Sequence, residues 1–478
     1  MARRAEEQTV VVVGAGLVGA MTAVLLGRRG YRVKVYEGRA DPRSHPSECA
    51  GAGGAAGDSA MLGRLANATK RSINLALSHR GLCALRKIGL EQQVLREAVP
   101  MEGRMIHPRG QADVAVGSIF QPYEHRPGHA IYSISREDLN FALLREVDTM
   151  PNVETTFGAK FEAYDKTRSE AVFSIGEGST KRREAVACAF VVGADGAFSK
   201  VREALGRLER LNFSRQYITT AYKEFSIPAT PAGEYAMPPH ALHIWPRGEY
   251  MLIALPNLDG SFTCTLFFPF EGENSFSSLN SPDRIHAFFA SQFPDTIALI
   301  PDLQTDFLEN PTGKLVTIRC SPWHVGGKAL LLGDAAHAIV PFYGQGMNCA
   351  FEDCTVLNQM IDSFGDDWET VFAEFSRSRK PNADAIAQLA LDNFIEMRDS
   401  VADPKFLMKK KLERLLETTF PGEFLSTYSR VTFHRSPYSE ALARGRVQDQ
   451  ILMDICQSVD SIEKLDLRQV LSKLKEGF

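Results

Sequence analysis

The sequence predicts an α/β protein (α+β overall), built from a domain with parallel strands and helices, an antiparallel sheet and a C-terminal helical region. Three observations lead to this fold class. A glycine-rich turn joins a valine-rich strand to a helix near the start of the chain, within residues 9–37. Apolar and polar residues alternate in "LHIWPRGEYMLIALPN" and "GSFTCTLFFPF", as they do in strands of an antiparallel sheet. From about residue 376 onward the composition is helical.

The bulk composition is that of an ordinary globular protein. The chain has 478 residues, 44% of them hydrophobic and 23% charged, with a formal net charge of -4. This length is enough for two or three domains. The chain has no excess of basic residues, so its composition gives no reason to expect nucleic acid as a partner. The cysteines form no CxxC pair and the histidines no HExxH motif. We therefore expect no disulfide framework, no metal site and a cytoplasmic location.

The start of the chain imitates an export signal or a membrane segment. Arg3 and Arg4 precede an apolar run over residues 10–26, which is the order found in signal peptides. Glu6 and Glu7 interrupt the positive flank, and no A-x-A cleavage pattern follows. A membrane helix needs about 20 apolar residues, and this run carries glycines near its middle. We expect a soluble protein with no membrane association.

The first motif is a dinucleotide-binding fingerprint. A strand at Thr9–Val13 leads into Gly14-Ala15-Gly16-Leu17-Val18-Gly19, a helix follows over Ala20–Arg29, and "YRVKVYE" forms a second strand that ends in Glu37. The acid follows the glycines by the spacing that such sites require. The pattern predicts a Rossmann-like domain.

Each feature of such a turn has a physical role here. Gly14 permits the tight turn, Gly16 lets the backbone approach a pyrophosphate, and Gly19 allows the helix to pack closely on the strand. The pyrophosphate then lies on the helix N-terminus, beside Val18. Glu37 would accept hydrogen bonds from the adenosine ribose. It would also repel the 2′-phosphate of NADPH, and Arg39 is expected to pack on the adenine.

Two later motifs decide which nucleotide is bound. "FVVGADGAFSKVR" (190–202) combines a short strand with Asp195-Gly196, and "KALLLGDAAHAIVPFYGQGMNCAFEDC" (328–354) ends another strand at Asp334. An acid at the end of a buried strand, beside a helix N-terminus, can bind a ribityl hydroxyl. The helix that follows would present the backbone N–H groups of Gly346, Met347 and Asn348 to the pyrimidine edge of a flavin.

Together, the fingerprint, "GADG" and "GDAAHAIVP…GQGMN" resemble the motifs of the class A flavoprotein aromatic hydroxylases. The resemblance implies bound FAD, with its ADP half on the first motif and Asp334 at the ribityl and pyrophosphate region. In that class the Asp195-Gly196 motif serves both FAD and NADPH. NADPH binds these enzymes transiently, without a nucleotide domain of its own.

Further stretches are similar to the kynurenine 3-monooxygenase family within this class, in its bacterial form without a membrane anchor. They cover essentially the whole chain: "RSINLALSHRGLCALRKIGL" (71–90), "MEGRMIH" (101–107), "YSISREDLN" (132–140), "LHIWPRGEYMLIALPNLDGSFTCTLFFPFE" (242–271), "DNFIEM" (392–397) and "TYSRVTFHRSPYSEA" (427–441). The resemblance implies that Arg104 binds the substrate carboxylate, that Tyr123 and Tyr428 are its partners, and that Asn393 makes an amide contact.

The same resemblance implies contacts to FAD from Arg136 and from the backbone of Ala76. On the strand "LHIWP", we expect Leu242, Ile244 and Trp245 to wall the pocket for the substrate ring, although each of them would serve equally well in the core of the sheet.

The implied reaction is the conversion of L-kynurenine to 3-hydroxykynurenine, as in tryptophan degradation. NADPH reduces FAD, the reduced flavin and O2 form a C4a-hydroperoxide, and the ring carbon ortho to the aniline nitrogen attacks it. The amino group already activates the ring, so no strong protein base is required. No residue is assigned as a catalytic acid or base, and His337 is expected to be a structural residue of its turn.

The expected layout is an FAD-binding domain over residues 8–205, rejoined at 315–375, with an antiparallel substrate domain at 206–314 between the two parts. A helical region over 376–478 closes the substrate site. Residues 44–70 form a small-residue insertion, which we expect to be a surface loop.

Alternatives to this function remain open. The same chemistry could act on a related amino-aromatic substrate in secondary metabolism. An NAD-dependent dehydrogenase is disfavoured by the Asp334 motif, and a non-catalytic flavoprotein by the intact motifs. The expected partners are a small-molecule substrate and, in a homodimer, a second copy of the chain.

Overall fold

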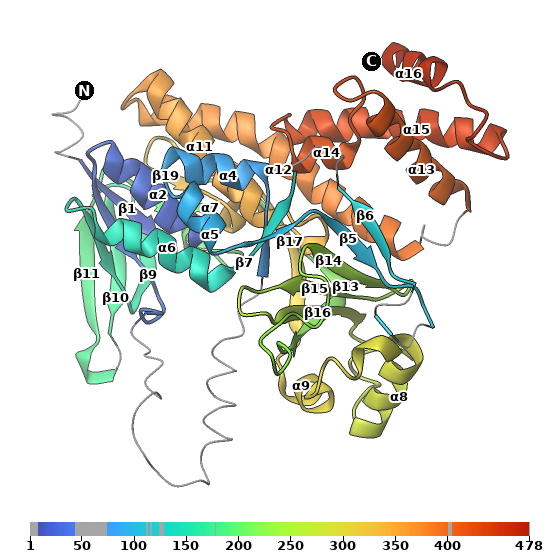
Figure 1. The fold of residues 1–478 in the computed structure, drawn as a ribbon. Coiled ribbons are helices and arrows are strands. Elements are labelled where there is room, and N and C mark those ends of the chain that lie inside the picture. Colours follow the sequence, from blue (N-terminus) through green and yellow to red (C-terminus); the bar gives the residue numbers. More distant parts are fainter. Residues whose placement is uncertain are drawn as a thin grey trace, which may run out of the picture.

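The computed structural model describes residues 8–43, 74–110, 113–114, 117–123, 129–176, 178–399 and 404–477. The 44–70 insertion lies outside the described residues. The architecture is mixed α/β, with a parallel sheet, a large antiparallel sheet and a set of C-terminal helices (Figure 1). The predicted fold class is confirmed.

The parallel sheet contains the strands that the sequence predicts within residues 9–13, 31–37, 190–202 and 328–332, together with β8 and β18, and β18 runs antiparallel to its neighbour β19. Its order is β18-β19-β12-β1-β2-β8. The strands are β1 (Thr9–Val13), β2 (Arg32–Tyr36), β8 (Val153–Thr156), β12 (Phe190–Gly193), β18 (His324–Val325) and β19 (Ala329–Leu331). Residues 10–12 have no exposed surface, as expected for a central strand that is covered on both faces. Helices α2 (Leu17–Arg28) and α6 (Arg136–Asp148) pack against each other beside this sheet.

Two small sheets and several short helices complete this part of the protein. One sheet has the order β3-β7-β4 and the other β11-β10-β9. Their strands are β3 (Asn74–Leu77), β4 (Val99–Met101), β7 (Ile131–Ser135), β9 (Ala159–Asp165), β10 (Glu170–Ile175) and β11 (Arg182–Ala187). The helices are α4 (His79–Lys87), α5 (Glu91–Arg96), α7 (Lys200–Leu208) and α10 (Asp334–His337).

The antiparallel sheet takes its strands from three separate parts of the chain, and its pairs are antiparallel except that of β14 with β5, which is parallel. Its order is β17-β13-β16-β15-β14-β5-β6. The strands are β5 (Gly103–Ile106), β6 (Ile119–Pro122), β13 (Asn212–Ile227), β14 (Ala241–Pro246), β15 (Met251–Pro256), β16 (Phe262–Pro269) and β17 (Gly313–Ser321). Helices α8 (Pro282–Gln292) and α9 (Leu303–Glu309) lie together at the outer side of this sheet (Figure 1). An aromatic core that includes Phe262, Phe289 and Phe307 fills the space between them.

Strand β14 shows how the sheet separates two environments. Side chains on a strand alternate between its two faces, so Leu242 and Ile244 face the central cavity. His243 and Trp245 face the opposite side and are fully buried. The Trp245 indole donates to Asp295 Oδ2 at 2.7 Å. The expectation that Trp245 walls the ring pocket is therefore wrong, because its side chain lies on the face of β14 opposite to Leu242 and Ile244.

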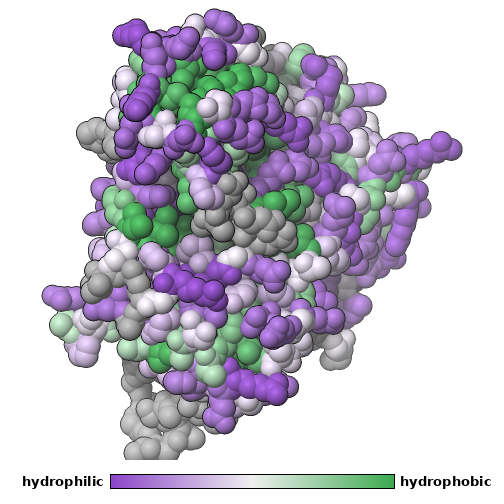
Figure 2. Space-filling view, turned by 90° about the vertical axis from the view of Figure 1, so that its right-hand side faces the viewer, coloured by the Kyte–Doolittle hydropathy of each residue, from purple (hydrophilic) through white to green (hydrophobic). Residues whose placement is uncertain are grey.

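The C-terminal part is helical, as predicted. Its helices are α11 (Gly346–Phe364), α12 (Trp368–Asp399), α13 (Pro404–Thr419), α14 (Thr427–Thr432), α15 (Tyr438–Ser458) and α16 (Leu467–Glu476). Helices α13, α15 and α16 share a core of their own around Leu412, Leu452 and Leu471. The face seen in Figure 2 is mostly hydrophilic, with a hydrophobic group of side chains near its upper end. Among the described residues, we find no helix with the length and apolar character needed to cross a membrane.

Two fully buried histidines behind β14 give the protein an acid-sensitive element. Burial lowers the pKa of His107 to about 3 and that of His243 to about 4, from an ordinary value of 6.5. Both rings are neutral in the folded protein, whereas the unfolded chain takes up protons below pH 6.5. The free energy of unfolding should therefore fall as the pH falls from about 6.5 to about 4.

By about pH 5 this loss amounts to about 2 kcal/mol for each histidine. Thermal unfolding measured at about pH 7.5 and about pH 5 checks the prediction, with the His107→Phe/His243→Phe double variant as the comparison. The variant should lose less of its Tm between the two conditions than the unchanged protein. Equal losses would contradict the assignment of the acid sensitivity to this pair.

Candidate active site

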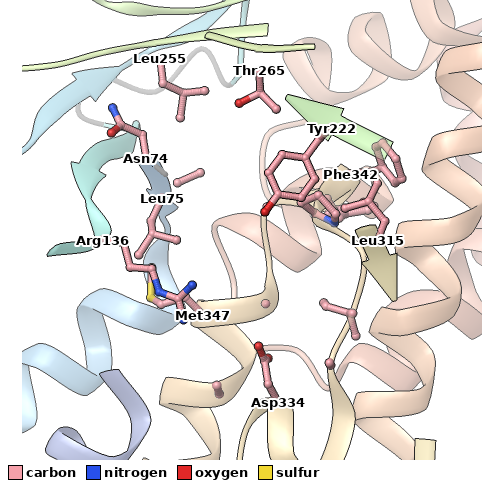
Figure 3. Close-up of a pocket in the computed structure, with 18 of the residues that line it drawn as sticks. Asn74, Leu75, Arg136, Tyr222, Leu255, Thr265, Leu315, Asp334, Phe342 and Met347 are labelled. Carbon is pink, nitrogen blue, oxygen red and sulfur yellow. The ribbon is translucent and has the colours of Figure 1, made fainter. Parts of the chain in front are cut away.

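A cavity of about 440 Å³ lies where the parallel sheet, the antiparallel sheet and the C-terminal helices meet. This size falls in the range of small-molecule and cofactor sites. Figure 3 shows Tyr222, Leu255 and Thr265 entering it from the antiparallel sheet, while Arg136, Asp334 and Met347 enter from the opposite side. Most of its lining is apolar, with charged groups at separate points.

The glycine turn has the shape of a phosphate cradle. Gly14 has φ +102°, which favours glycine, and its N–H donates to Tyr36 O at 2.8 Å. A Cβ on Gly19 would lie 1.8 Å from Gly14 O, whereas a Cβ on Gly16 would meet nothing within 4 Å. Helix α2 makes its first internal hydrogen bond from Ala20 N–H to Gly16 O. The N–H groups before it, including that of Val18, are the start-of-helix donors on which a diphosphate would sit.

Glu37 is fixed beside this turn. Its carboxylate accepts the Ala15 N–H at 2.9 Å and the Arg39 Nε–H at 2.9 Å. Burial acts to raise the pKa of Glu37, but the hydrogen bonds from Arg39 and Ala15 outweigh it and hold that pKa below its ordinary value. The carboxylate is therefore ionised and able to accept ribose hydroxyls. Arg39 is 79% exposed and pairs with Glu37 outside the cavity lining.

Asp334 lies half-buried on the cavity wall at the start of α10. Burial raises the pKa of its carboxyl, and the charges of Arg136 and His337 act against that rise. Gly333 before it has φ +57°, and a Cβ there would come within 2.9 Å of the Val18 side chain. Arg136 is the first residue of α6 and projects into the same cavity (Figure 3). The structure thus brings Asp334, Arg136 and the glycine turn together.

The start of α11 forms another wall. Its first internal hydrogen bond runs from Cys349 N–H to Gln345 O, so the N–H groups of Gly346, Met347 and Asn348 precede it. The Asn348 side chain is already committed, because it accepts the Ser78 N–H and donates to Ala76 O at 2.8 Å. Only the Asn348 backbone therefore remains for a flavin, and Ala76 lines the cavity while its carbonyl holds α11.

The Asp195 side chain, like those of Glu37 and Arg39, is not part of the cavity lining. Its carboxylate accepts the Ser199 hydroxyl at 2.5 Å and the Lys200 N–H at 2.6 Å, and it therefore caps the start of α7. Its neighbours Ala194 and Gly196 line the cavity, but the Asp195 side chain does not. This side chain holds the loop in shape rather than facing a ligand.

Arg104 and Tyr428 line another part of the cavity, and Tyr123 packs against both of them without being part of the lining. The Arg104 guanidinium lies 4.6 Å from the centre of the Tyr428 ring, and the two tyrosine rings stack with centres 5.5 Å apart. Burial acts to lower the pKa of Arg104, but the two tyrosine oxygens raise it above its ordinary value. The guanidinium is therefore charged. Within the described part of the chain, the buried Arg104 Nε and Tyr123 hydroxyl have no hydrogen-bond partner. Such a set of donors fits an anionic ligand.

Asn393 acts on this region through the backbone. Its amide donates to Phe342 O at 2.7 Å and is not part of the cavity lining. Phe342 lines the cavity and stacks on Phe394 with ring centres 4.3 Å apart. Tyr343, for which the sequence suggested no role, also lines the cavity and stacks on Tyr428 at 5.7 Å. Asn393 therefore supports the loop that carries two cavity walls.

Sequence reasoning missed Tyr222 of β13, whose hydroxyl points into the cavity (Figure 3). Burial raises the pKa of Tyr222, as does Glu224, while Arg136 lowers it. The signal was present in the alternation of "AYKEFSI", in which Tyr222 and Glu224 share the face opposite to Lys223.

Sequence reasoning also missed a buried ionic cluster behind α11. Glu352 accepts Arg80 Nη1–H and Arg379 Nη1–H, each at 2.7 Å. Asp353 accepts Arg379 Nε–H at 2.8 Å and pairs with His337 Nε2 at 2.5 Å. This arrangement gives His337 the structural role expected of it.

His337, Asp353 and Cys349 lie close enough together to hold a metal ion. Asp353 is already neutralised by Arg379, however, and burial raises the pKa of the Cys349 thiol. The chemistry of this donor set therefore favours ion pairs over a metal.

Comparison with known proteins identifies the family of the chain. Residues 7–390 match the family described as FAD binding domain. The chain is 44% identical over 471 residues to a kynurenine 3-monooxygenase from Myxococcus xanthus, covering 98% of this chain and 96% of that protein. It is 45% identical over 458 residues to a kynurenine 3-monooxygenase from Flavobacterium psychrophilum, covering 96% and 95%. The chain belongs to the kynurenine 3-monooxygenase family.

A solved structure supports the fold of this kynurenine 3-monooxygenase family member. The tetrameric form of 2-methyl-3-hydroxypyridine-5-carboxylic acid oxygenase superposes with a TM-score of 0.61 at 19% identity, covering 84% of this chain and 95% of that one. The residues also fit FAD. The space above Gly16, the helix-start donors and the ionised Glu37 match an ADP group, and Asp334 continues the site into the cavity. The expected family and cofactor are confirmed.

The glycine turn yields a matched pair of substitutions. Gly16→Ala places a methyl group in open space, so the apoprotein should keep its Tm while the Kd for FAD rises at least tenfold, because the methyl occupies the diphosphate position. Gly19→Ala drives a Cβ against Gly14 O and should lower the Tm of the apoprotein itself. Thermal unfolding and FAD titration of both apoproteins check this. An unchanged FAD affinity in Gly16→Ala would contradict the cradle.

Proposed function

We propose that this protein is an FAD-dependent, NADPH-consuming monooxygenase that converts L-kynurenine and O2 to 3-hydroxykynurenine. The observation that carries the proposal is the position of the Arg104 cluster. The charged guanidinium of Arg104, with unused donor capacity, faces a cavity whose other wall is the FAD cradle, and the Tyr123 hydroxyl near it also has unused donor capacity. Such an arrangement suits an aromatic amino acid, with its carboxylate on Arg104 and its ring directed toward the cofactor.

The protein groups orient the substrate. Arg104 and Tyr123 would bind the α-carboxylate, and a planar guanidinium fork suits a bidentate contact. Leu242, Ile244 and Phe342 are apolar walls, which would hold the aromatic ring and exclude water. FAD, when bound, supplies the redox chemistry by accepting electrons from NADPH and transferring one oxygen atom of O2 to the ring. Because the substrate's amino group activates its own ring, no protein base is assigned.

The remaining site assignments belong to the same proposal. Gly14, Gly16, Val18 and Gly19 would hold the pyrophosphate, with Glu37 at the ribose. The ribityl and flavin portion would lie against these residues: Ala76, Arg136, Asp334, Gly346, Met347 and Asn348. Arg39 acts by holding Glu37, and Asp195 acts by holding the loop that leads into α7. Tyr428 orients Arg104, and Asn393 supports the Phe342 loop.

The larger organisation is also proposed. FAD would be bound by residues 8–205 together with 315–375, the substrate by 206–314, and residues 376–478 would close the site. We propose a cytoplasmic location, in line with seven described cysteines that are all free thiols. We further propose a homodimer.

The function is tested by purifying the protein, recording whether FAD copurifies, and following NADPH oxidation with and without L-kynurenine. We expect oxidation to be stimulated by L-kynurenine and the hydroxylated product to appear in the mass spectrum. A parallel reaction with anthranilate distinguishes the alternative of a related amino-aromatic substrate. FAD-bound protein that shows neither stimulation nor product would overturn the proposal.

The carboxylate contact is tested by Arg104→Ala. Loss of a charged hydrogen-bond partner costs about 2–5 kcal/mol, so the KM for L-kynurenine should rise at least thirtyfold while FAD stays bound. Arg284→Ala is the control, because Arg284 lies on α8, away from the cavity lining. An Arg104→Ala variant that loses FAD but binds L-kynurenine normally would instead identify Arg104 as a cofactor or structural residue.

A further inference from the structure

The two residues proposed to bind the carboxylate are carried by the edge of a sheet. Arg104 lies on β5, and Tyr123 immediately follows β6. Strand β6 is the outermost strand and pairs with β5 alone, while β5 is joined to β14 over four register pairs. Residues 119–121 of β6 are exposed, so burial does little to specify the register of this edge hairpin. Its position must therefore depend on further contacts.

Such contacts occur on the face of the sheet away from the cavity. His107, directly after β5, approaches His243 of β14, with Nε2 and Nδ1 2.8 Å apart. Ser118, directly before β6, places its Oγ 2.9 Å from His107 Nδ1. His243 Nε2 contacts Pro238 O at 2.8 Å. A single hydrogen-bonded chain, Ser118–His107–His243, thus ties both strands of the β5–β6 hairpin to β14, at the end where β5 finishes and β6 begins.

The rings of this chain are also held by packing. The His107 ring stacks on Trp245 with centres 4.1 Å apart and an interplanar angle of 10°. Trp245 is fixed by its bond to Asp295, and Arg247 Nη1–H donates to His107 O at 3.0 Å. Apolar side chains would fill this core without the cost of burying polar groups. A directional polar chain specifies one register and one orientation instead.

The pairing of β5 with β14 and β6 connects the Ser118–His107–His243 chain to Arg104 and Tyr123. Leu242, which neighbours His243 on β14, is the register partner of Arg104 on β5. Arg104 in turn pairs in register with Gln121 of β6, close to Tyr123. A shift of the hairpin by one residue would turn Arg104 away from the cavity.

We propose that the Ser118–His107–His243 chain is a positioning element for substrate binding, which fixes the β5–β6 hairpin on β14 and so holds Arg104 and Tyr123 toward the carboxylate. This inference rests on the proposed function. His107, His243 and Ser118 touch neither substrate nor cofactor and act through Arg104 and Tyr123.

The test compares His107→Phe and His243→Phe, which keep a ring for the stack on Trp245 but remove the hydrogen bonds, with the unchanged holoenzyme. The KM for L-kynurenine should rise at least tenfold while kcat stays within threefold. The KM for the decarboxylated amine of kynurenine should change less than twofold. Combined with Arg104→Ala, His107→Phe should add little further increase, because both changes remove the same contact.

Ser118 provides a milder version of the experiment, since it is half-buried and its removal spares the rings. Ser118→Ala should raise the KM for L-kynurenine, and Ser118→Thr, which keeps a hydroxyl, should restore it. Phe289→Leu is the matched control for a general loss of stability, because Phe289 belongs to the aromatic core on the same face of the sheet.

Three results would overturn the inference: a KM increase in Phe289→Leu equal to that in His107→Phe, an equal KM increase for the decarboxylated amine, or full additivity with Arg104→Ala. Each leaves the proposed function intact as long as the unchanged protein hydroxylates L-kynurenine. No turnover by the unchanged protein would overturn both.

Discussion

The double ion pair at Glu352 is the interaction on which the rest of the site depends. Arg80 comes from α4, Glu352 from α11 and Arg379 from α12, and all three side chains are buried. Arg80 also donates to Val431 O and Ser436 O in the C-terminal region. Removing one partner of a buried pair leaves an uncompensated charge, which typically costs about 3–5 kcal/mol. The cluster therefore fixes the relative positions of four segments that are distant in sequence.

This cluster also relates the two halves of the cavity. Asp353, the neighbour of Glu352, accepts the Gly333 N–H and pairs with His337, so it shapes the loop that presents Asp334. Through Val431 and Ser436, Arg80 holds the segment that follows Tyr428. The cofactor side and the substrate side of the cavity are thus attached to one charged core, and neither is free to move independently of α11.

The parts of this arrangement that sequence predicts are the local ones. The glycine turn, its strands and Glu37 form a contiguous pattern whose spacing is imposed by backbone geometry, and the structure has all of them in place. The choice of FAD came from Asp334, again a strand-to-helix junction. Arg104 and Tyr123 could be recognised only by resemblance, because nothing in their local sequence distinguishes them from surface residues. Their convergence depends on a sheet edge formed far along the chain.

Long-range polar contacts account for most of what was missed. Arg80 and Glu352 are separated by 272 positions, and no periodicity links them. One signal was present, since the adjacent acids Glu352 and Asp353 interrupt the mostly apolar run "CAFEDCTVL" (349–357), and buried acids require cationic partners. Trp245 was misplaced for a different reason. Trp245 follows Leu242 by three positions on the same strand, and strand alternation therefore places the two side chains on opposite faces of the sheet.

The pairing of β5 with β14 has a consequence for how the chain folds. His107 and His243 are 136 positions apart, and β7–β12, α6, α7 and β13 lie between them in the sequence. During synthesis the β5–β6 hairpin emerges long before the strand that receives it, and contacts of such high sequence separation form slowly. The parallel sheet likewise cannot be completed until β12 and β19 have been synthesised. The newly made chain therefore holds the edge that carries Arg104 unpaired until β14 is made, and an unpaired strand edge is prone to aggregation.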